Sequence, residues 1–248
     1  MRFLAVDEGN SCIKVGLFRG STHTPESVWS IQHPLCPDDL PRILGEEQRG
    51  LPLCLSSVRA PEHTAALFSR FSTTVILCQA QKIPLSSAYA PGELGIDRAL
   101  GALGALYHYP QENCIIIDAG TAITIDLLKD TNVFCGGFIL PGITAKRDGL
   151  CQKTPRLATA LESRGLFLSP TIPQNTREAL SGGILLDTCG GIEKCVSHLA
   201  SFVQSPRIIA TGGSWDTVAP YMSISVQYIP HLVLQGIAAY CRTITPRL

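Results

Sequence analysis

The stretch "CIIIDAGTAITIDLL", residues 114–128, decides the fold. Two apolar runs flank a short turn of small residues, and one carboxylate, Asp118, stands where the first run ends. This pattern predicts two strands joined by a tight turn. A packed core needs neither the acid nor Gly120 and Thr121, so we expect the turn to have a further role.

The N-terminus repeats this pattern. "FLAVDEGNSCIKVGLF", residues 3–18, also runs from an apolar strand through an aspartate, any residue, a glycine and short polar residues into a returning strand. Asp7 and Asp118 occupy matching places, 111 positions apart (118 − 7). Two related halves that meet at a cleft would explain the repeat. One repeat is too few for a solenoid and suits a duplicated α/β domain.

Short strands and helices alternate along the rest of the chain, which is typical of the α/β class. The pattern predicts strands over 51–58, 73–78, 133–143 and 207–213, and helices over 61–71, 91–109, 144–170, 176–203 and 232–242. The Pro-, Ser- and Thr-rich stretch 19–50 receives no assignment. We expect two domains, residues 1–110 and 111–248.

The composition excludes several classes of protein. The 248 residues carry 20 basic and 20 acidic side chains without a basic run, so neither a nucleic-acid nor a membrane surface is indicated. No segment reaches the about 18 apolar residues of a membrane span, and the N-terminus becomes acidic too soon for a signal peptide. We therefore expect a cytoplasmic protein. The ten cysteines form no C-x-x-C pair and are expected to be reduced thiols, and no transition-metal site is indicated.

Both turns have residues suited to phosphate binding. Glycine lets the backbone approach a ligand, and Asn10, Ser11 and Thr121 supply short donors beside backbone N–H groups. An aspartate beside a phosphate implies an intervening cation, commonly Mg²⁺ with a nucleotide. Asp and Gly also suit an ordinary hairpin turn, which would be the better explanation of either hairpin alone. Two matching hairpins and "ATGG" (210–213) at a third strand end favour the nucleotide site.

Four other residues have two interpretations each. Asp97 in the first turn of its predicted helix is either a favourable contact with the helix dipole, worth about 0.3–1 kcal/mol, or a general base. Arg98 beside it could bind an anionic group of a substrate. Lys14 either contacts phosphate or is a solvated strand residue, and Tyr89 could be a plain loop aromatic.

Six motifs in order resemble the type III pantothenate kinases and their relatives, the Bvg accessory factor proteins. These motifs are "DEGNSCIK", "YAPGELGIDR", "IIIDAGTAITID", "GGFILPG", "NTREALSGG" and "IIATGG", between about residues 3 and 240. The resemblance implies an actin-like ATPase (ribonuclease H-like) fold with two duplicated domains and a cleft between them. It also implies a homodimer that uses ATP to phosphorylate pantothenate, the first step of coenzyme A biosynthesis.

The resemblance also implies roles for individual residues. It assigns these residues of the two turns to ATP binding: Asp7, Gly9, Asn10, Ser11, Lys14, Gly120 and Thr121. It assigns these to pantothenate binding: Tyr89, Gly95, Ile96, Asp97, Arg98 and Thr176. Asp97 would be the catalytic proton acceptor, and Asp118 would bind a monovalent cation, K⁺ or NH₄⁺. Thr176 would reach the neighbouring subunit's site.

Three departures from the family pattern bear on these roles. Glu8 stands where the family usually has an apolar residue and adds negative charge near the phosphates. Ser11 replaces a threonine, and the spacing from Tyr89 to Asp97 is one residue shorter than usual. The leading hypothesis is a pantothenate kinase that needs Mg²⁺–ATP. The alternatives are a non-catalytic regulatory relative, which Glu8 would favour, and an actin-like kinase for another small acid.

Overall fold

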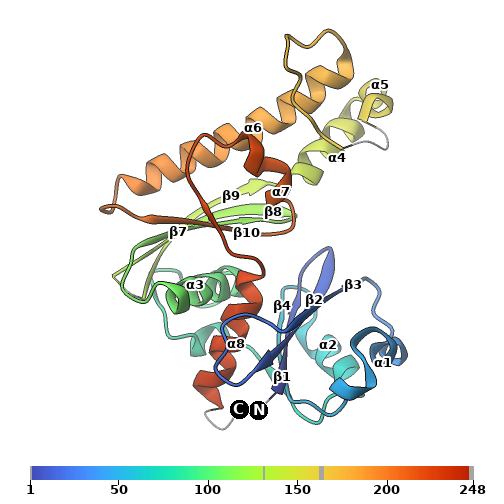
Figure 1. The fold of residues 1–248 in the computed structure, drawn as a ribbon, viewed down its shortest axis with the longest axis vertical. Coiled ribbons are helices and arrows are strands. Elements are labelled where there is room, and N and C mark those ends of the chain that lie inside the picture. The colour runs from blue at the N-terminus through green and yellow to red at the C-terminus, as the bar shows by residue number, and fades with distance from the viewer. Residues whose placement is uncertain (1, 131, 162–164, 246–248) are drawn as a thin grey trace. The chain divides into compact units, whose positions relative to one another are not determined.

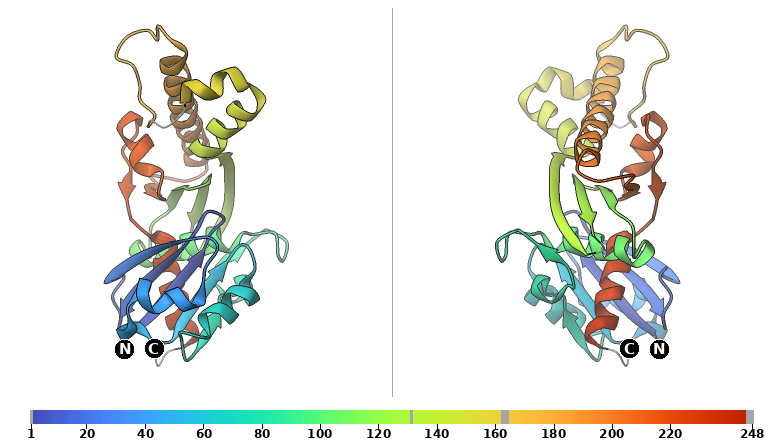
Figure 2. Two further views of the ribbon diagram at one scale, coloured as in Figure 1. Left: turned by 90° about the vertical axis from the view of Figure 1, so that its right-hand side faces the viewer. Right: turned by 90° about the vertical axis from the view of Figure 1, so that its left-hand side faces the viewer.

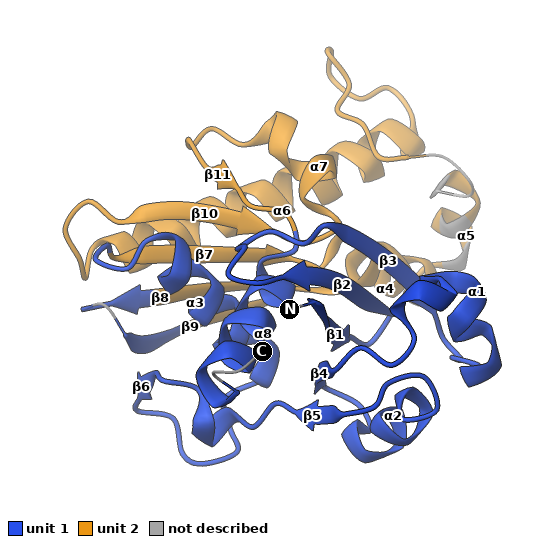
Figure 3. Ribbon diagram, turned by 60° about the horizontal axis from the view of Figure 1, so that its bottom comes forward, with its two compact units in different colours: residues 1–112, 128–136, 231–248 blue, residues 113–127, 137–230 orange. Residues whose placement is uncertain are grey.

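The structure is a computed structural model that describes residues 2–130, 132–161 and 165–245 (Figures 1 and 2). The chain forms two compact units (Figure 3). Unit 1 contains residues 1–112, 128–136 and 231–248, and unit 2 contains residues 113–127 and 137–230. The predicted pair of duplicated domains, 1–110 and 111–248, is a different partition and stays a prediction.

Unit 1 is built on a sheet whose described strands run in the order β3-β2-β1-β4-β5. Strand β1 pairs antiparallel with β2 and parallel with β4. The strand bounds are β1 Arg2–Glu8, β2 Cys12–Arg19, β3 Ser27–Gln32, β4 Leu53–Ser57 and β5 Val75–Leu77. The helix bounds in this unit are α1 Leu40–Leu44, α2 Pro61–Phe68, α3 Ile96–His108 and α8 Leu232–Ile244, with short 3₁₀ turns at Pro37–Asp39, Glu46–Gln48 and Ala80–Lys82.

The sheet of unit 1 is buried on both faces, which explains the unbroken apolar run at its start. Successive side chains of a strand point to opposite faces, so Phe3 and Ala5 pack with α3 and α8, whereas Leu4 and Val6 pack with α1 and α2. Figure 1 shows α8 beside β1. This two-sided packing places the ends of β1 and β2 within a rigid scaffold.

Unit 2 contains most of a second sheet, whose described strands run in the order β11-β10-β7-β8-β9-β6. The short β6, the end of β8 and the start of β9 belong to unit 1. The strand bounds are β6 Ser86–Ser87, β7 Cys114–Ala119, β8 Ala122–Lys129, β9 Val133–Pro141, β10 Arg207–Thr211 and β11 Gln227–Tyr228. The helix bounds are α4 Ile143–Lys153, α5 Pro155–Ala158, α6 Thr176–Ala200 and α7 Trp215–Val218, with 3₁₀ turns at Thr159–Leu161 and Ala219–Tyr221.

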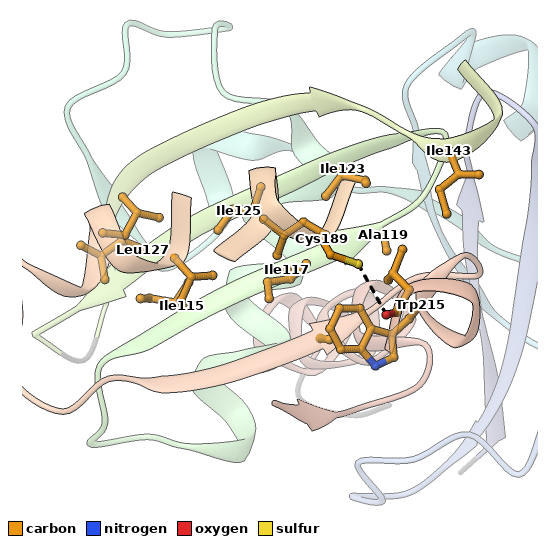
Figure 4. Packing of buried hydrophobic residues seen from close by; sticks show 14 of the residues in the cluster. Ile115, Ile117, Ala119, Ile123, Ile125, Leu127, Ile143, Cys189 and Trp215 are labelled. Atoms are coloured by element: carbon orange, nitrogen blue, oxygen red, sulfur yellow. Dashed lines mark hydrogen bonds between the residues drawn. The ribbon is translucent and has the colours of Figure 1, made fainter. Parts of the chain in front are cut away.

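The isoleucines of the opening stretch form the core of unit 2. Ile115, Ile117, Ile123 and Ile125 point to one face of the sheet and pack against residues of α6 and α7 (Figure 4). In the same cluster Cys189 Sγ donates to the carbonyl oxygen of Val218, 3.7 Å away (Figure 4). The apolar half of the stretch is therefore structural, and it fixes the position of the turn that it carries.

The two predicted hairpins are confirmed, and they resemble each other in burial. From Phe3 to Glu8 in β1 and from Cys114 to Ala119 in β7, four buried residues precede a half-buried aspartate and one further buried residue. The returning strands share a buried stretch at matching places. The turn between β1 and β2 has one residue more than the turn between β7 and β8. The sequence repeat is thus also a repeat of local structure.

Other expectations need adjustment. The helical prediction for 144–170 holds for Ile143–Lys153 and, after a break, as far as residue 161, but residues 165–170 are not helical. Residues 162–164 lie outside the described part of the chain. The glycine pairs 182–183 and 190–191 do not break α6. One glycine of each pair packs against a side chain, Gly182 against Leu168 and Gly191 against Leu140, whereas Gly183 and Gly190 have open space around them. Across the described residues, no helix has the length and apolar character needed to cross a membrane.

Candidate active site

The first turn joins β1 to β2 and carries Asp7 and Lys14. These two residues are directly opposite each other in the antiparallel register, so their side chains lie on one face of the sheet. Both are half-buried, whereas Asn10 and Ser11 at the tip are exposed. The turn therefore presents one acidic and one basic side chain next to a polar, solvent-accessible tip.

Two successive carbonyl oxygens of this turn accept hydrogen bonds from neighbouring segments. His33 Nε2 donates to Gly9 O over 3.1 Å, and Arg59 Nη1 donates to Asn10 O over 2.9 Å. The C=O and N–H of one planar trans peptide point in opposite directions. The N–H groups of Asn10 and Ser11 therefore point away from these two donors, as in a backbone site for an anion.

Glu8 is surrounded differently from its neighbour Asp7. Its side chain is only 5% exposed, and its Oε2 accepts from Ser57 Oγ at 2.5 Å and from Thr64 Oγ1 at 2.7 Å. Because successive strand residues point to opposite faces, the Glu8 carboxylate lies on the face away from Asp7 and Lys14. The unusual acid of the first loop thus contacts α2 rather than the face that carries Asp7.

The second turn joins β7 to β8 and carries Asp118, Gly120 and Thr121. Gly142 N donates to Thr121 O over 3.1 Å, and a Cβ on Gly142 would collide with the carbonyl oxygens of Gly120 and Thr121. Gly212 has a φ of +98°, and a Cβ there would lie 2.5 Å from Asp118 Oδ1. Two glycines from distant segments thus pack directly against the turn.

Strand β10 brings the "ATGG" motif to this turn. It runs parallel to β7 with Thr211 beside Asp118, and Ser214 N donates to Ala119 O over 2.9 Å. Tyr228 of β11 lies beside Ala210 of this strand, and burial and then the carboxylates of Asp216 and Asp118 raise the pKa of its hydroxyl. Unit 2 therefore gathers three glycine-bearing segments around Asp118, which suits a close approach by a ligand.

The residues expected to bind pantothenate begin α3 in unit 1. Gly95 is its N-cap, and the Asp97 carboxylate accepts from the backbone N–H of Arg98 at 2.8 Å. A Cβ on Gly95 would lie 2.7 Å from Asp97 Oδ1, so a side chain there would displace the carboxylate. The helix start thus fixes Asp97 in a hydrogen-bonded setting at a positive helix end.

Tyr89 lies against Arg98, together with a residue that the sequence did not single out. The Arg98 guanidinium carbon is 5.6 Å from the Tyr89 ring centroid and 5.5 Å from that of Phe134. The Tyr89 hydroxyl is 3.5 Å from both Nη atoms of Arg98. Phe134 precedes the "GG" pair of the fourth motif, but nothing in the local pattern indicated its contact with Arg98.

Two further residues expected to bind pantothenate are Ile96 and Thr176. Ile96 is half-buried and packs against the core beneath α3. Thr176 is exposed at the first position of α6 in unit 2, where Asn175 caps the helix by accepting from Glu178 N at 3.0 Å. In unit 1, Tyr89 and Arg98 are brought into contact, and so are Asp118 and the "ATGG" strand in unit 2.

The described residues contain no cluster of three or more His, Cys, Asp or Glu side chains arranged to hold a metal ion. A magnesium ion with few protein ligands is typical of nucleotide sites, where phosphates and waters complete the coordination. The Asp118 carboxylate is a hard oxygen ligand of the kind that Mg²⁺ prefers. The donor set thus fits cations that arrive with a nucleotide better than a closed metal site.

Comparison with solved structures identifies the fold. The fold is that of the actin-like ATPases. MreB 5 of Spiroplasma citri, solved with bound AMPPNP, has a TM-score of 0.50 at 10% identity and covers 99% of this chain and 97% of its own. A protein of Campylobacter jejuni described as a Baf family transcriptional activator has a TM-score of 0.65 at 24% identity over 99% of this chain and all of its own.

Comparison with related sequences identifies the family. The family model of the type III pantothenate kinases matches residues 3–198. The type III pantothenate kinase of Synechococcus sp. (strain JA-3-3Ab) is 30% identical over 247 residues, 97% of this chain and 92% of its own. The chain therefore belongs to the type III pantothenate kinase family, as its motifs predicted.

Proposed function

We propose that the protein catalyses the ATP-dependent phosphorylation of pantothenate to 4'-phosphopantothenate, the first step of coenzyme A biosynthesis. Membership of the type III pantothenate kinase family is the observation that carries this proposal. The oxygen of the primary hydroxyl of pantothenate bonds to the γ-phosphorus of ATP while the bond to the β–γ bridging oxygen breaks. ADP leaves, and the hydroxyl proton passes to the enzyme.

Within this reaction Asp97 accepts the proton, and Arg98 pairs with the pantothenate carboxylate. The Asp97 carboxylate already accepts one hydrogen bond from a backbone N–H, which orients it for this role. Gly95, Ile96, Tyr89 and Thr176 complete the pantothenate side. Catalysis of this kind depends mainly on positioning and on charge stabilisation.

The two turns bind the nucleotide in this proposal. They supply the ATP-binding residues Asp7, Gly9, Asn10, Ser11, Lys14, Gly120 and Thr121. Mg²⁺ would neutralise the developing charge on the phosphates, and Asp118 would hold a monovalent cation, K⁺ or NH₄⁺. The close packing of Gly142 and Gly212 against the Asp118 turn supports the proposal because it holds the backbone of this turn in one position.

A homodimer and a cytoplasmic location also belong to the proposal, and both rest on the family resemblance and the sequence. Light scattering after gel filtration tests the dimer, for which we expect twice the 26.6 kDa of one chain. A mass equal to one chain at micromolar concentration would reject it.

The activity is tested by coupled ADP release with purified protein, ATP, Mg²⁺ and pantothenate. We expect pantothenate-dependent ADP formation that falls when K⁺ is replaced by Na⁺. Asp97→Asn should lower kcat by at least about 100-fold, which is the usual contribution of a general base. Asp118→Asn should abolish the difference between K⁺ and Na⁺.

The outcomes separate the candidate functions. Binding of pantothenate or ATP in calorimetry without turnover would favour a regulatory relative. Turnover with another small acid but not with pantothenate would favour a kinase of different specificity. Near-normal turnover of Asp97→Asn would remove Asp97 as the base and leave the activity intact.

A further inference from the structure

Arg98 lies in a corner formed by two aromatic rings of unit 1. Its guanidinium carbon is 5.6 Å from the Tyr89 centroid and 5.5 Å from the Phe134 centroid, and the two centroids are 5.9 Å apart. These three distances form a nearly equilateral triangle. Both rings therefore lie on the same side of the guanidinium carbon, whereas rings stacked on its two faces would be about twice as far apart.

The corner is assembled by the short strand β6. Ser86 N donates to Asn132 O over 2.9 Å, and Ser87 pairs with Phe134 in a parallel ladder. Tyr89 N then donates to Ser87 Oγ over 3.2 Å, which brings the tyrosine next to Phe134. Phe134 is only 1% exposed, so its ring is fixed by packing.

The second ring is also confined by its surroundings. Gly136 has a φ of +96°, and a Cβ on it would lie 3.1 Å from the Tyr89 ring and 3.2 Å from its hydroxyl. The Tyr89 ring therefore rests on the bare backbone of β9. Both rings that contact Arg98 thus depend on β9. One ring belongs to Phe134, and the other, that of Tyr89, packs on Gly136 two residues further along the strand.

A flexible arginine loses rotamer freedom when it binds a carboxylate, and this loss opposes binding. Cation–π contacts that restrict the guanidinium beforehand reduce that loss and preset the direction of its paired N–H donors. A carboxylate needs this direction because it accepts from both donors at once. A substrate group that forms one neutral hydrogen bond depends on it less.

We propose that Phe134 is a positioning residue that selects for the carboxylate of the substrate by fixing the orientation of Arg98. The proposal rests on the proposed function, since Arg98 must be the group that binds the acid. It adds a specificity element from β9 that none of the six sequence motifs contains. Phe134 acts through Arg98 and is itself buried behind the site.

The test compares Phe134→Leu and Phe134→Met with the wild type in the ADP-release assay. Both variants remove the ring, and methionine retains more of the buried volume. We expect the KM for pantothenate to rise about 3- to 30-fold, the range that loss of one cation–π contact gives. The kcat and the KM for ATP should stay within about twofold.

The alcohol analogue of pantothenate, which lacks the carboxylate, provides the specific readout. Its KM, or its inhibition constant if it is not turned over, should be equal in wild type and in both variants. A merely structural defect would weaken the acid and the alcohol alike. Selectivity for the acid over the alcohol should therefore fall by the same 3- to 30-fold factor.

Phe3 supplies a matched control in the same unit. It is fully buried, and Arg242 lies 5.5 Å from its ring centroid, but neither residue belongs to the proposed site. Phe3→Leu and Phe3→Met should lower the melting temperature to a similar extent and leave the KM for pantothenate unchanged.

The proposal is overturned if folded Phe134 variants keep the wild-type selectivity, or if the Phe3 variants lose it equally. Either result would leave the kinase activity of the wild type standing. If the wild type neither phosphorylates pantothenate nor binds it in calorimetry, the proposed function fails, and the role of Phe134 fails with it.

Discussion

Adjacent acidic residues in β1 have different surroundings because the strand turns successive side chains to opposite faces. Asp7 lies directly opposite Lys14, and their side chains share one face of the sheet next to the first turn. Glu8 points into unit 1, where the hydroxyls of Ser57 and Thr64 bind one of its carboxylate oxygens. An acid in the phosphate loop is thus compatible with a kinase, because its side chain binds the protein scaffold.

This arrangement predicts the effect of substitutions at Glu8. Glu8→Gln retains an oxygen that accepts from both hydroxyls, so we expect its stability to stay within about 1 kcal/mol of wild type. Glu8→Val, which restores the apolar residue type usual in the family, leaves both hydroxyls without this acceptor and should cost about 1–3 kcal/mol. Urea unfolding measures both differences.

The KM for ATP distinguishes this role from an effect of charge on the phosphates. We expect Glu8→Gln to change it by less than about twofold, because the carboxylate lies on the far face of β1. A severalfold lower KM for ATP, most pronounced at low salt, would mean that the Glu8 charge does reach the nucleotide.

At the scale of single residues, the sequence predicted the residues of the repeated hairpins but not those whose role comes from packing between distant segments. Asp7 and Asp118 were found because two hairpins share a pattern, and the confirmed hairpins share burial as well. Phe134 and Gly142 were not found, because their contacts with Arg98 and Thr121 join segments far apart in the chain. Gly95 was identified only through the family motif. The reason for a glycine at this position is the nearby Asp97 carboxylate, which is visible only in three dimensions.

Among the elements, α3 and α8 owe their close packing to a glycine on each helix. A Cβ on Gly236 of α8 would collide with the carbonyl group of Leu100, and a Cβ on Gly104 of α3 would lie 2.5 Å from Leu232 O. Backbone atoms cannot move aside as side-chain ends can. Neither glycine can therefore gain a side chain without separating the two helices.

We accordingly expect Gly236→Ala to destabilise the protein. Overpacking against backbone costs about 1–3 kcal/mol, although alanine favours helix by up to about 1 kcal/mol over glycine. Gly183 of α6 is the matched control, since nothing lies within 4 Å of a Cβ built there. Thermal unfolding should show a lower melting temperature for Gly236→Ala and an equal or higher one for Gly183→Ala.

If Gly236→Ala unfolded at the wild-type temperature, the contact between α3 and α8 would be looser than the structure has it.

The same contact shows what limits prediction from local pattern. The two helices were predicted at 91–109 and 232–242 from their periodicity. The bounds of α8 are close to the prediction, whereas α3 begins later than predicted, at Ile96, because residues 91–95 form a turn. Their pairing was not predicted, because helical periodicity identifies a buried face and not the partner that covers it.

For the whole molecule, the chain order differs from the order of packing. Residues 231–245 follow unit 2 in sequence but pack with the sheet of unit 1, and β8 and β9 pass from one unit to the other. Sequence repeats locate the two turns but do not indicate such crossings. The fold class was predictable because the turns are local, whereas the route of the chain depends on contacts between distant segments.

The sequence predicts that the turns at Asp7 and Asp118 bind one nucleotide, although each belongs to a different unit. A double-mutant cycle tests this with Asp7→Asn, Asp118→Asn and the double variant, using kcat/KM for ATP. Residues that share a ligand are typically coupled by about 0.5–3 kcal/mol, whereas distant residues without a shared partner are additive within about 0.3–0.5 kcal/mol. We expect coupling between Asp7 and Asp118.

The control cycle pairs Asp7→Asn with Asp148→Asn. Asp148 also belongs to unit 2, but its side chain is 51% exposed and pairs with Arg147 at 3.1 Å. This second pair should be additive, because a surface ion pair contributes little and contacts no nucleotide in the proposal. Additivity in both cycles would mean that the two turns act on separate ligands, and the repeat would then record duplication without a shared nucleotide site.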